Sequence, residues 1–74
     1  MGDEIIKKLK ILLSHWMEHN REHAAEYEKW ASLAREANLE EVALILQAAI
    51  EEIEKTNAKL TQAAEIIAQR ITGE

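Results

Sequence analysis

The chain has 74 residues and a mass of 8.5 kDa, which makes one domain near the lower size limit for a stable monomeric core. It is 47% apolar and 31% charged with a formal net charge of −5, which indicates a folded protein in water and argues against nucleic-acid binding. Without cysteine, it has no disulfides, thiolate metal ligands or cysteine nucleophiles. No apolar run is long enough for a membrane span and no apolar signal core begins the chain, so we expect a cytoplasmic protein without membrane contact.

The first half of the chain predicts one long helix over about residues 3–37. No proline occurs, and the two glycines are at the ends of the chain, so nothing forces a break. An apolar stripe at helical spacing marks the face of this helix that we expect to be buried: Ile5, Leu9, Leu12, Trp16, Tyr27, Trp30 and Ala34. We expect the three large rings, Trp16, Tyr27 and Trp30, to anchor the core.

A turn is predicted at Asn38, where the first stripe ends and a second begins. Asn38 is either the N-cap of the second helix, with Glu41 three residues later as its capping partner, or the left-handed residue that ends the first helix. The second helix is predicted over about residues 39–72. Its apolar stripe includes Val42, Ile45, Leu46, Ala49, Ile53, Leu60, Ala63, Ala64 and Ile67.

These elements predict an all-α fold, an antiparallel two-helix hairpin. Because the chain reverses near residue 38, the numbers of facing residues should add up to about 76, which places Trp16 beside Leu60 and Trp30 beside Leu46. The stripes are wider than one hairpin can cover, so we expect two hairpins to dimerise into a four-helix bundle. The alternative is a three-helix bundle in which the first helix breaks near Asn20.

The same register predicts a shared polar layer. The first stripe turns polar at His19, Asn20 and His23, and the second turns polar at Thr56 and Asn57. Since these two interruptions face each other, we expect one buried or half-buried polar site between the helices.

Three histidines within nine residues predict a metal site. His15, His19 and His23 recur every four residues, and each is followed three residues later by a glutamate. Positions four apart share a helix face, and imidazole suits Zn²⁺, Ni²⁺, Co²⁺ and Cu²⁺. On a wheel centred on Trp16, His23 falls about 20° and His19 about 60° from the centre of the stripe. We therefore expect His19 and His23 to bind a divalent transition metal. Glu22, Glu26 or His15 would supply a further metal ligand, and Asn57 would support the ligands from outside the coordination shell.

The same segment has two other interpretations. In the first, the His, Asn and Thr side chains form a structural layer that sets the register of an interaction or oligomerisation module. In the second, the string from His19 to His23 is the H-x-x-E-H of inverted zinc peptidases. Those enzymes need a substrate cleft and further ligands for which this chain is too small, so we expect no enzymatic activity.

The histidine segment also resembles a small uncharacterised microbial domain family. The signature of that family is approximately H-W-x-E-H-N-x-x-H-A-x-x-(F/Y)-x-x-W-A, followed by a second helix that begins L-E-E-V-A. This chain carries His15 to Asn20, His23, Ala24, Tyr27, Trp30 and Ala31 in the first part and Leu39 to Ala43 in the second. The resemblance covers about residues 12–60, and it implies that His15, His19, Asn20 and His23 are functional positions of a family whose function is unassigned.

Overall fold

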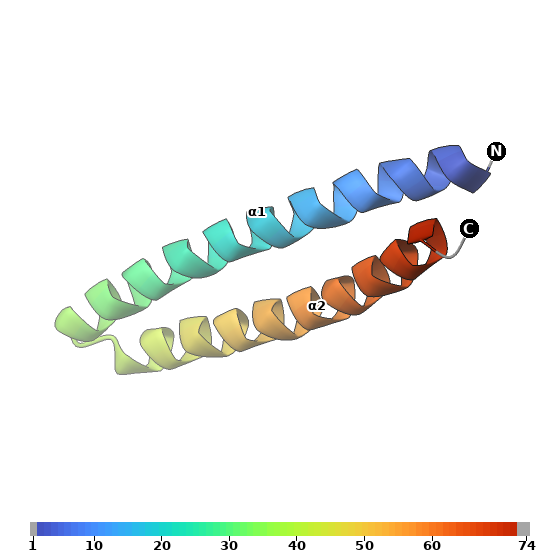
Figure 1. The fold of residues 1–74 in the computed structure, drawn as a ribbon. Helices are drawn as coiled ribbons and strands as arrows, with labels where there is room; N and C mark the ends of the chain where they lie inside the picture. Colours follow the sequence, from blue (N-terminus) through green and yellow to red (C-terminus); the bar gives the residue numbers. More distant parts are fainter. Residues whose placement is uncertain (1, 73–74) are drawn as a thin grey trace.

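The computed structural model describes residues 2–72, with side chains as far as residue 70, and folds them into two antiparallel helices (Figure 1). Helix α1 spans Gly2–Glu36 and helix α2 spans Glu40–Thr72. They lie side by side, so both chain ends are at one end of a rod of 56 × 15 × 14 Å (Figure 1). The prediction of an all-α hairpin is confirmed. The three-helix alternative is wrong, because α1 continues through Asn20 without a break.

The turn between the helices is built by Asn38 in a left-handed conformation, with φ of 63°. The N–H of Asn38 donates to the carbonyl of Arg35 at 3.0 Å, and the N–H of Leu39 donates to that of Ala34 at 2.8 Å. This pair of bonds is the Schellman motif, which satisfies the carbonyls at the end of a helix. Because Leu39 already accepts the first bond of α2, from Ala43, Asn38 ends α1 and is not the N-cap of α2.

The helices meet along an interhelical seam whose residues alternate between spacings of three and four from Leu13 onward, as in a coiled coil, with Ile6 one heptad before Leu13. The seam residues of α1 are Ile6, Leu13, Met17, Asn20, Ala24, Tyr27, Ala31 and Ala34, and those of α2 are Ala43, Leu46, Ile50, Ile53, Asn57, Leu60, Ala64 and Ile67. A hydrogen bond between Asn20 and Asn57 fixes the register. Facing residue numbers therefore add up to 77 (20 plus 57), one more than predicted.

Small side chains hold the helices close together at the turn. Ala31, Ala34 and Ala43 are buried, and Leu46 packs against them. The connection between α1 and α2 is so short that their backbones must approach closely there, and only small residues leave room for that approach. This requirement determines which face of α1 turns inward.

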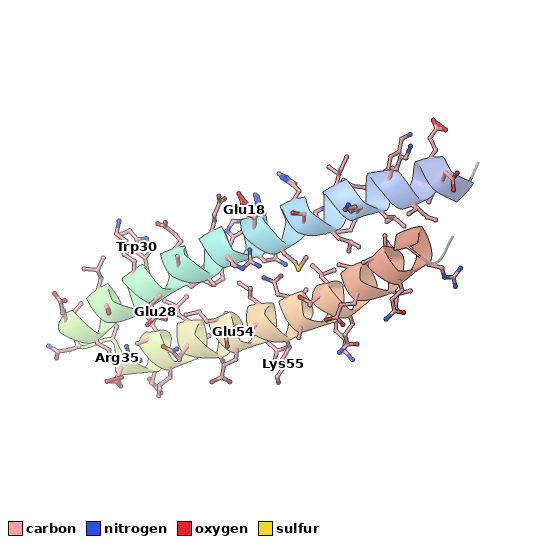
Figure 2. The ribbon with its side chains drawn as sticks, viewed as in Figure 1. Glu18, Glu28, Trp30, Arg35, Glu54 and Lys55 are labelled. Carbon is pink, nitrogen blue, oxygen red and sulfur yellow. The ribbon has the colours of Figure 1, made fainter. Side chains whose placement is uncertain are left out.

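Trp16 and Trp30 lie outside the seam, so the prediction that they anchor the hairpin core is wrong. Their side chains are 42% and 53% exposed, and Trp30 lies along the outer edge of α1 in Figure 2. Each stands one residue before a seam position (Met17 and Ala31), which rotates it by about 100° around the helix. Tyr27 is half-buried in the seam.

The core of the hairpin is small for the apolar content of the chain. Among the described residues the buried ones are Leu13, Ala31, Ala34, Ala43 and Ile50, and no large side chain is fully buried. Within residues 2–70, twelve large apolar side chains are at least 36% exposed. No helix within residues 2–72 is both long enough and apolar enough to cross a membrane.

Candidate metal centre

The three histidines form a row along the exposed side of α1. The ring centroids of His15 and His19 are 6.1 Å apart, and those of His19 and His23 are 4.5 Å apart. The ring of Tyr27 continues the row at 6.2 Å from His23. One helical turn separates each residue from the next, which brings side chains four positions apart onto one face.

His19 and His23 have the closest approach in this row. Their Nε2 atoms are 2.9 Å apart and share a hydrogen bond at the protein surface. Two nitrogens bound to one Zn²⁺ at about 2.0–2.1 Å lie about 2.9–3.4 Å apart when the angle between the bonds is about 90–109°. The pair is thus already spaced as two ligands of one ion. Binding requires both rings to carry their hydrogen on Nδ1, which leaves both Nε2 lone pairs available.

The three predicted additional ligands, Glu26, Glu22 and His15, lie in different surroundings on α1. The carboxylate of Glu26 accepts a hydrogen bond from Trp30 Nε1 at 3.0 Å, so it is turned toward that ring. Glu22 is exposed on the same helix, and His15 lies one turn before His19. Within the described part of the chain, no three His, Asp or Glu side chains converge closely enough to hold a metal together. A single hairpin therefore presents a pair of ligands.

The shared polar layer predicted between the helices is divided in the structure. Asn20 and Asn57 lie in the seam and are half-buried, whereas His19 and His23 are exposed. The prediction that His23 lies inside the seam is wrong, because the wheel was centred on Trp16 and the true seam is rotated by one residue. His23 is next to the seam residue Ala24, about 100° around the helix.

The asparagine pair forms its own network inside the hairpin. Asn20 Nδ2 donates to Asn57 Oδ1 at 2.9 Å, and Asn57 Nδ2 donates to the backbone carbonyl of Met17 at 3.0 Å. The hydroxyl of Thr61 lies 3.3 Å from Met17 Sδ and donates to the carbonyl of Asn57 at 2.9 Å. Sequence reasoning missed Met17 and Thr61. Their only signal was their position: Met17 lies one turn before Asn20 in α1, and Thr61 lies one turn after Asn57 in α2.

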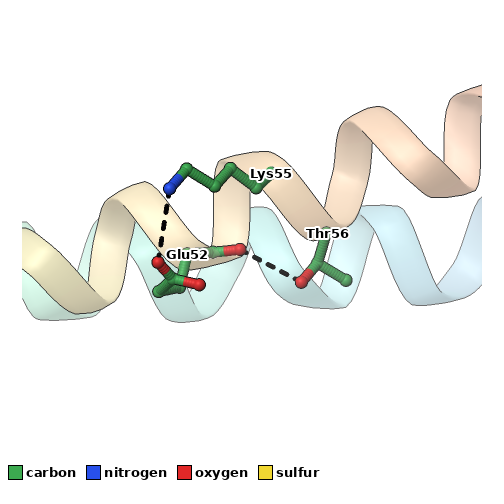
Figure 3. Close-up of polar contacts among 3 residues, drawn as sticks. All are labelled: Glu52, Lys55 and Thr56. Carbon is green, nitrogen blue, oxygen red and sulfur yellow. Dashed lines mark hydrogen bonds and ion pairs between the residues drawn. The ribbon is translucent and has the colours of Figure 1, made fainter.

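Thr56 does not join this network. Its side chain is exposed, and its hydroxyl donates to the carbonyl of Glu52 one turn earlier in the same helix, at 3.0 Å (Figure 3). Lys55 is also turned to Glu52, with 3.5 Å between Nζ and Oε2 (Figure 3). The expectation that Thr56 faces Asn20 is wrong for the same reason as for His23: a shift of one residue in register moves a helical position to another face.

A shallow pocket of about 400 Å³ connects the histidine row with the seam. It is lined by His15, Trp16, His19, Asn20 and Leu60. Trp16 and Leu60 line the same pocket, although the observed register places Leu60 opposite Met17 and leaves Trp16 outside the seam. The pocket places an exposed imidazole beside the half-buried amide of Asn20, and its walls are mostly apolar carbon.

These features define the class of protein as a two-helix antiparallel coiled coil with a surface row of histidines. The chain belongs to the family described as Domain of unknown function (DUF8180), whose match covers residues 9–67. That range includes the whole histidine row, the turn and most of α2, and it confirms the resemblance to an uncharacterised helical family. No curated protein and no solved structure matches the chain.

Proposed function

We propose that this domain is a non-enzymatic binder of a divalent transition metal, which it holds through His19 and His23. The observation that carries the proposal is the 2.9 Å separation of the two Nε2 atoms on the exposed face of a continuous helix. The helix holds the two residues one turn apart, and the hydrogen bond between their rings already brings the nitrogens to this spacing, so less side-chain freedom is lost on binding. Imidazole nitrogen favours Zn²⁺, Co²⁺, Ni²⁺ and Cu²⁺ over the hard cations.

The metal in this proposed site is bound cargo or a structural ion. The two imidazoles lie on the outer surface of one helix, whereas catalytic metal centres use a shaped cavity that excludes water. Two nitrogens fill half of a tetrahedral shell, so the remaining positions belong to water, to Glu22 or His15, or to a second chain.

A second candidate is an interaction module whose seam asparagines set the register of its helices. The bonds from Asn20 to Asn57 and from Asn57 to the Met17 carbonyl favour it, because a polar layer in an apolar seam is satisfied in only one alignment. The two candidates use different faces of α1 and are separated by adding metal.

The test is thermal unfolding of the chelator-treated protein with and without Ni²⁺ or Zn²⁺. A ligand that binds only the folded state stabilises it by about 2.7 kcal/mol at 100 times its Kd, which raises Tm of a domain this small by about 10–20 °C. The variant with His19→Gln and His23→Gln should lose this increase. Arg21→Gln, an exposed change in the same turn, should keep it.

An unchanged Tm at millimolar metal in the native sequence would reject the metal proposal and leave the interaction module. His15→Gln decides the third ligand: a smaller increase in Tm for this variant assigns His15 to the shell, and an unchanged increase assigns that position elsewhere.

A further inference from the structure

An unpartnered stripe of α1 runs directly beside the seam. Every member except Leu9, which precedes Lys10, stands one residue before a seam residue. We call these residues the outer stripe: Ile5, Leu9, Leu12, Trp16, His19, His23, Glu26, Trp30 and Leu33. They repeat with the same alternation of three and four as the seam, which is the pattern of a helix that packs against another helix. The large apolar members are 36–61% exposed in the hairpin.

Between Leu9 and Leu33 the outer stripe is symmetric about Arg21; Ile5, its first member, lies beyond this symmetric span. His19 and His23 stand two residues to either side, Leu12 and Trp30 nine, and Leu9 and Leu33 twelve. A twofold interface requires that if one residue contacts another, the reverse contact also forms. Two copies of α1 that cross antiparallel at Arg21 meet this requirement at each of these levels.

The remaining level pairs Trp16 with Glu26, five residues from the centre on either side. The Glu26 carboxylate is already bonded to Trp30 Nε1, so it does not enter the interface without a partner. Lys8 and Glu36 flank the stripe near its two ends, and antiparallel crossing brings these opposite charges of the two copies together.

The exposed area of the hairpin is large enough to need such a partner. Its accessible surface is 5929 Å², whereas a compact monomer of 8.5 kDa exposes about 4,700 Å². The excess of about 1,200 Å² exceeds the roughly 800 Å² that each partner buries in a standard interface.

We propose that the outer stripe docks a second copy of this chain in an antiparallel twofold arrangement, and that the two His19–His23 pairs meet at the axis and share one metal ion. The metal part rests on the proposed function above. The second copy completes the site, because each hairpin supplies two imidazoles and a tetrahedral ion takes four ligands. The Glu22 side chains of the two copies also flank the axis, where an ion between them offsets their mutual repulsion.

The first experiment measures mass by light scattering and bound Ni²⁺ by titration on the full chain. We expect twice the monomer mass of 8.5 kDa, with one ion per two chains. Absence of any bound metal would overturn the proposed function together with the shared ion. One ion per chain at monomer mass would leave the proposed function intact and overturn only the shared site.

The second experiment tests the geometry with cysteines, for which the native sequence has no background. The variant with both Leu9→Cys and Leu33→Cys should form a disulfide-linked dimer with diamide in the presence of Ni²⁺. The two positions are 24 residues apart on one helix, about 36 Å, so they cannot join within a chain. Leu9→Cys alone should remain uncrosslinked.

Efficient crosslinking of Leu9→Cys alone would mean that the helices run parallel, which overturns the arrangement. The antiparallel arrangement would also be overturned if the double variant failed to crosslink while circular dichroism showed that it is fully helical.

Discussion

At the scale of single residues, the seam and the outer stripe divide the polar side chains into two groups with different tasks. Asn20 donates a hydrogen bond to Asn57 inside the hairpin. This bond joins the two helices through residues that are 37 positions apart in the sequence. His19 and His23 bond to each other on the outside of one helix. The first pair reports on how α1 and α2 align, and the second is available to a ligand.

Removing one partner of the asparagine pair should destabilise the hairpin. In Asn57→Ala, the half-buried amide of Asn20 loses its acceptor, and we expect a loss of about 1–3 kcal/mol in the free energy of unfolding in urea. Thr56→Ala is the neighbouring control; since Thr56 is exposed, we expect a change within about 0.5 kcal/mol. Equal effects of the two substitutions would show that the seam bond contributes nothing.

Replacing both Asn20 and Asn57 by leucine should not destabilise the hairpin. With neither donor nor acceptor left in the seam, we expect the double variant to be as stable as the native protein or more stable. Its alignment should be less unique, because leucines pack in more than one register. Near-ultraviolet circular dichroism of the seam residue Tyr27 measures this, and we expect a weaker signal together with a higher stability.

At the scale of elements, the turn shows how local chemistry ends one helix and begins the next. Asn38 was predicted to be either an N-cap or the left-handed end of α1, and its φ of 63° together with the bond from Leu39 to Ala34 decides for the second. The ion pair between Arg35 and Glu40, 3.3 Å from Nε to Oε2, spans the turn but is largely exposed. Such a pair contributes about 0–1 kcal/mol, so the backbone conformation matters more.

Substitutions at Asn38 should therefore follow backbone preference. Asn38→Gly should leave stability unchanged or slightly raised, because glycine adopts positive φ without a steric penalty. Asn38→Ala should cost about 1–2 kcal/mol, because Cβ of alanine clashes with the carbonyl in that conformation. Urea unfolding of the two variants measures the difference, and an alanine variant as stable as the glycine variant would contradict it.

At the scale of the whole molecule, a single seam leaves much of α1 without a partner. The apolar side chains of the outer stripe, with Trp16 and Trp30 among them, are core residues only if a second surface covers them. The dimeric four-helix arrangement expected from the width of the stripes remains a prediction, and the structure indicates the face on which it can be tested.

A charge placed on the outer stripe should prevent association without unfolding the hairpin. Leu12→Glu removes an apolar contact opposite Trp30 of the second copy, so we expect a shift from dimer to monomer by light scattering, with helicity retained. Ile11→Glu is the matched control on the other side of the same helix, beside Lys7, Lys10 and Ser14. Equal dissociation by both variants would show that the outer stripe is not the interface.

The helices and the turn could be predicted from local information. Apolar spacing, the absence of interior glycine and proline, and an asparagine between two periodic segments are properties of neighbouring residues, and these bounds agree with the structure to within about one or two residues. The meeting of the two polar interruptions followed as well, because hairpin geometry ties residue numbers on the two helices together, but the register differs by one residue, so Asn20 pairs with Asn57 and not with Thr56.

The choice between two adjacent stripes needed the tertiary structure. Both stripes of α1 repeat at coiled-coil spacing, and the one with more large side chains carries Trp16, Trp30 and His23. Packing at the turn selects the other, because Ala31, Ala34 and Ala43 allow the backbones to approach where the short connection requires it and Trp30 does not. Periodicity counts apolar positions, whereas close packing depends on their volume, and that difference put the histidines on the outside of the hairpin.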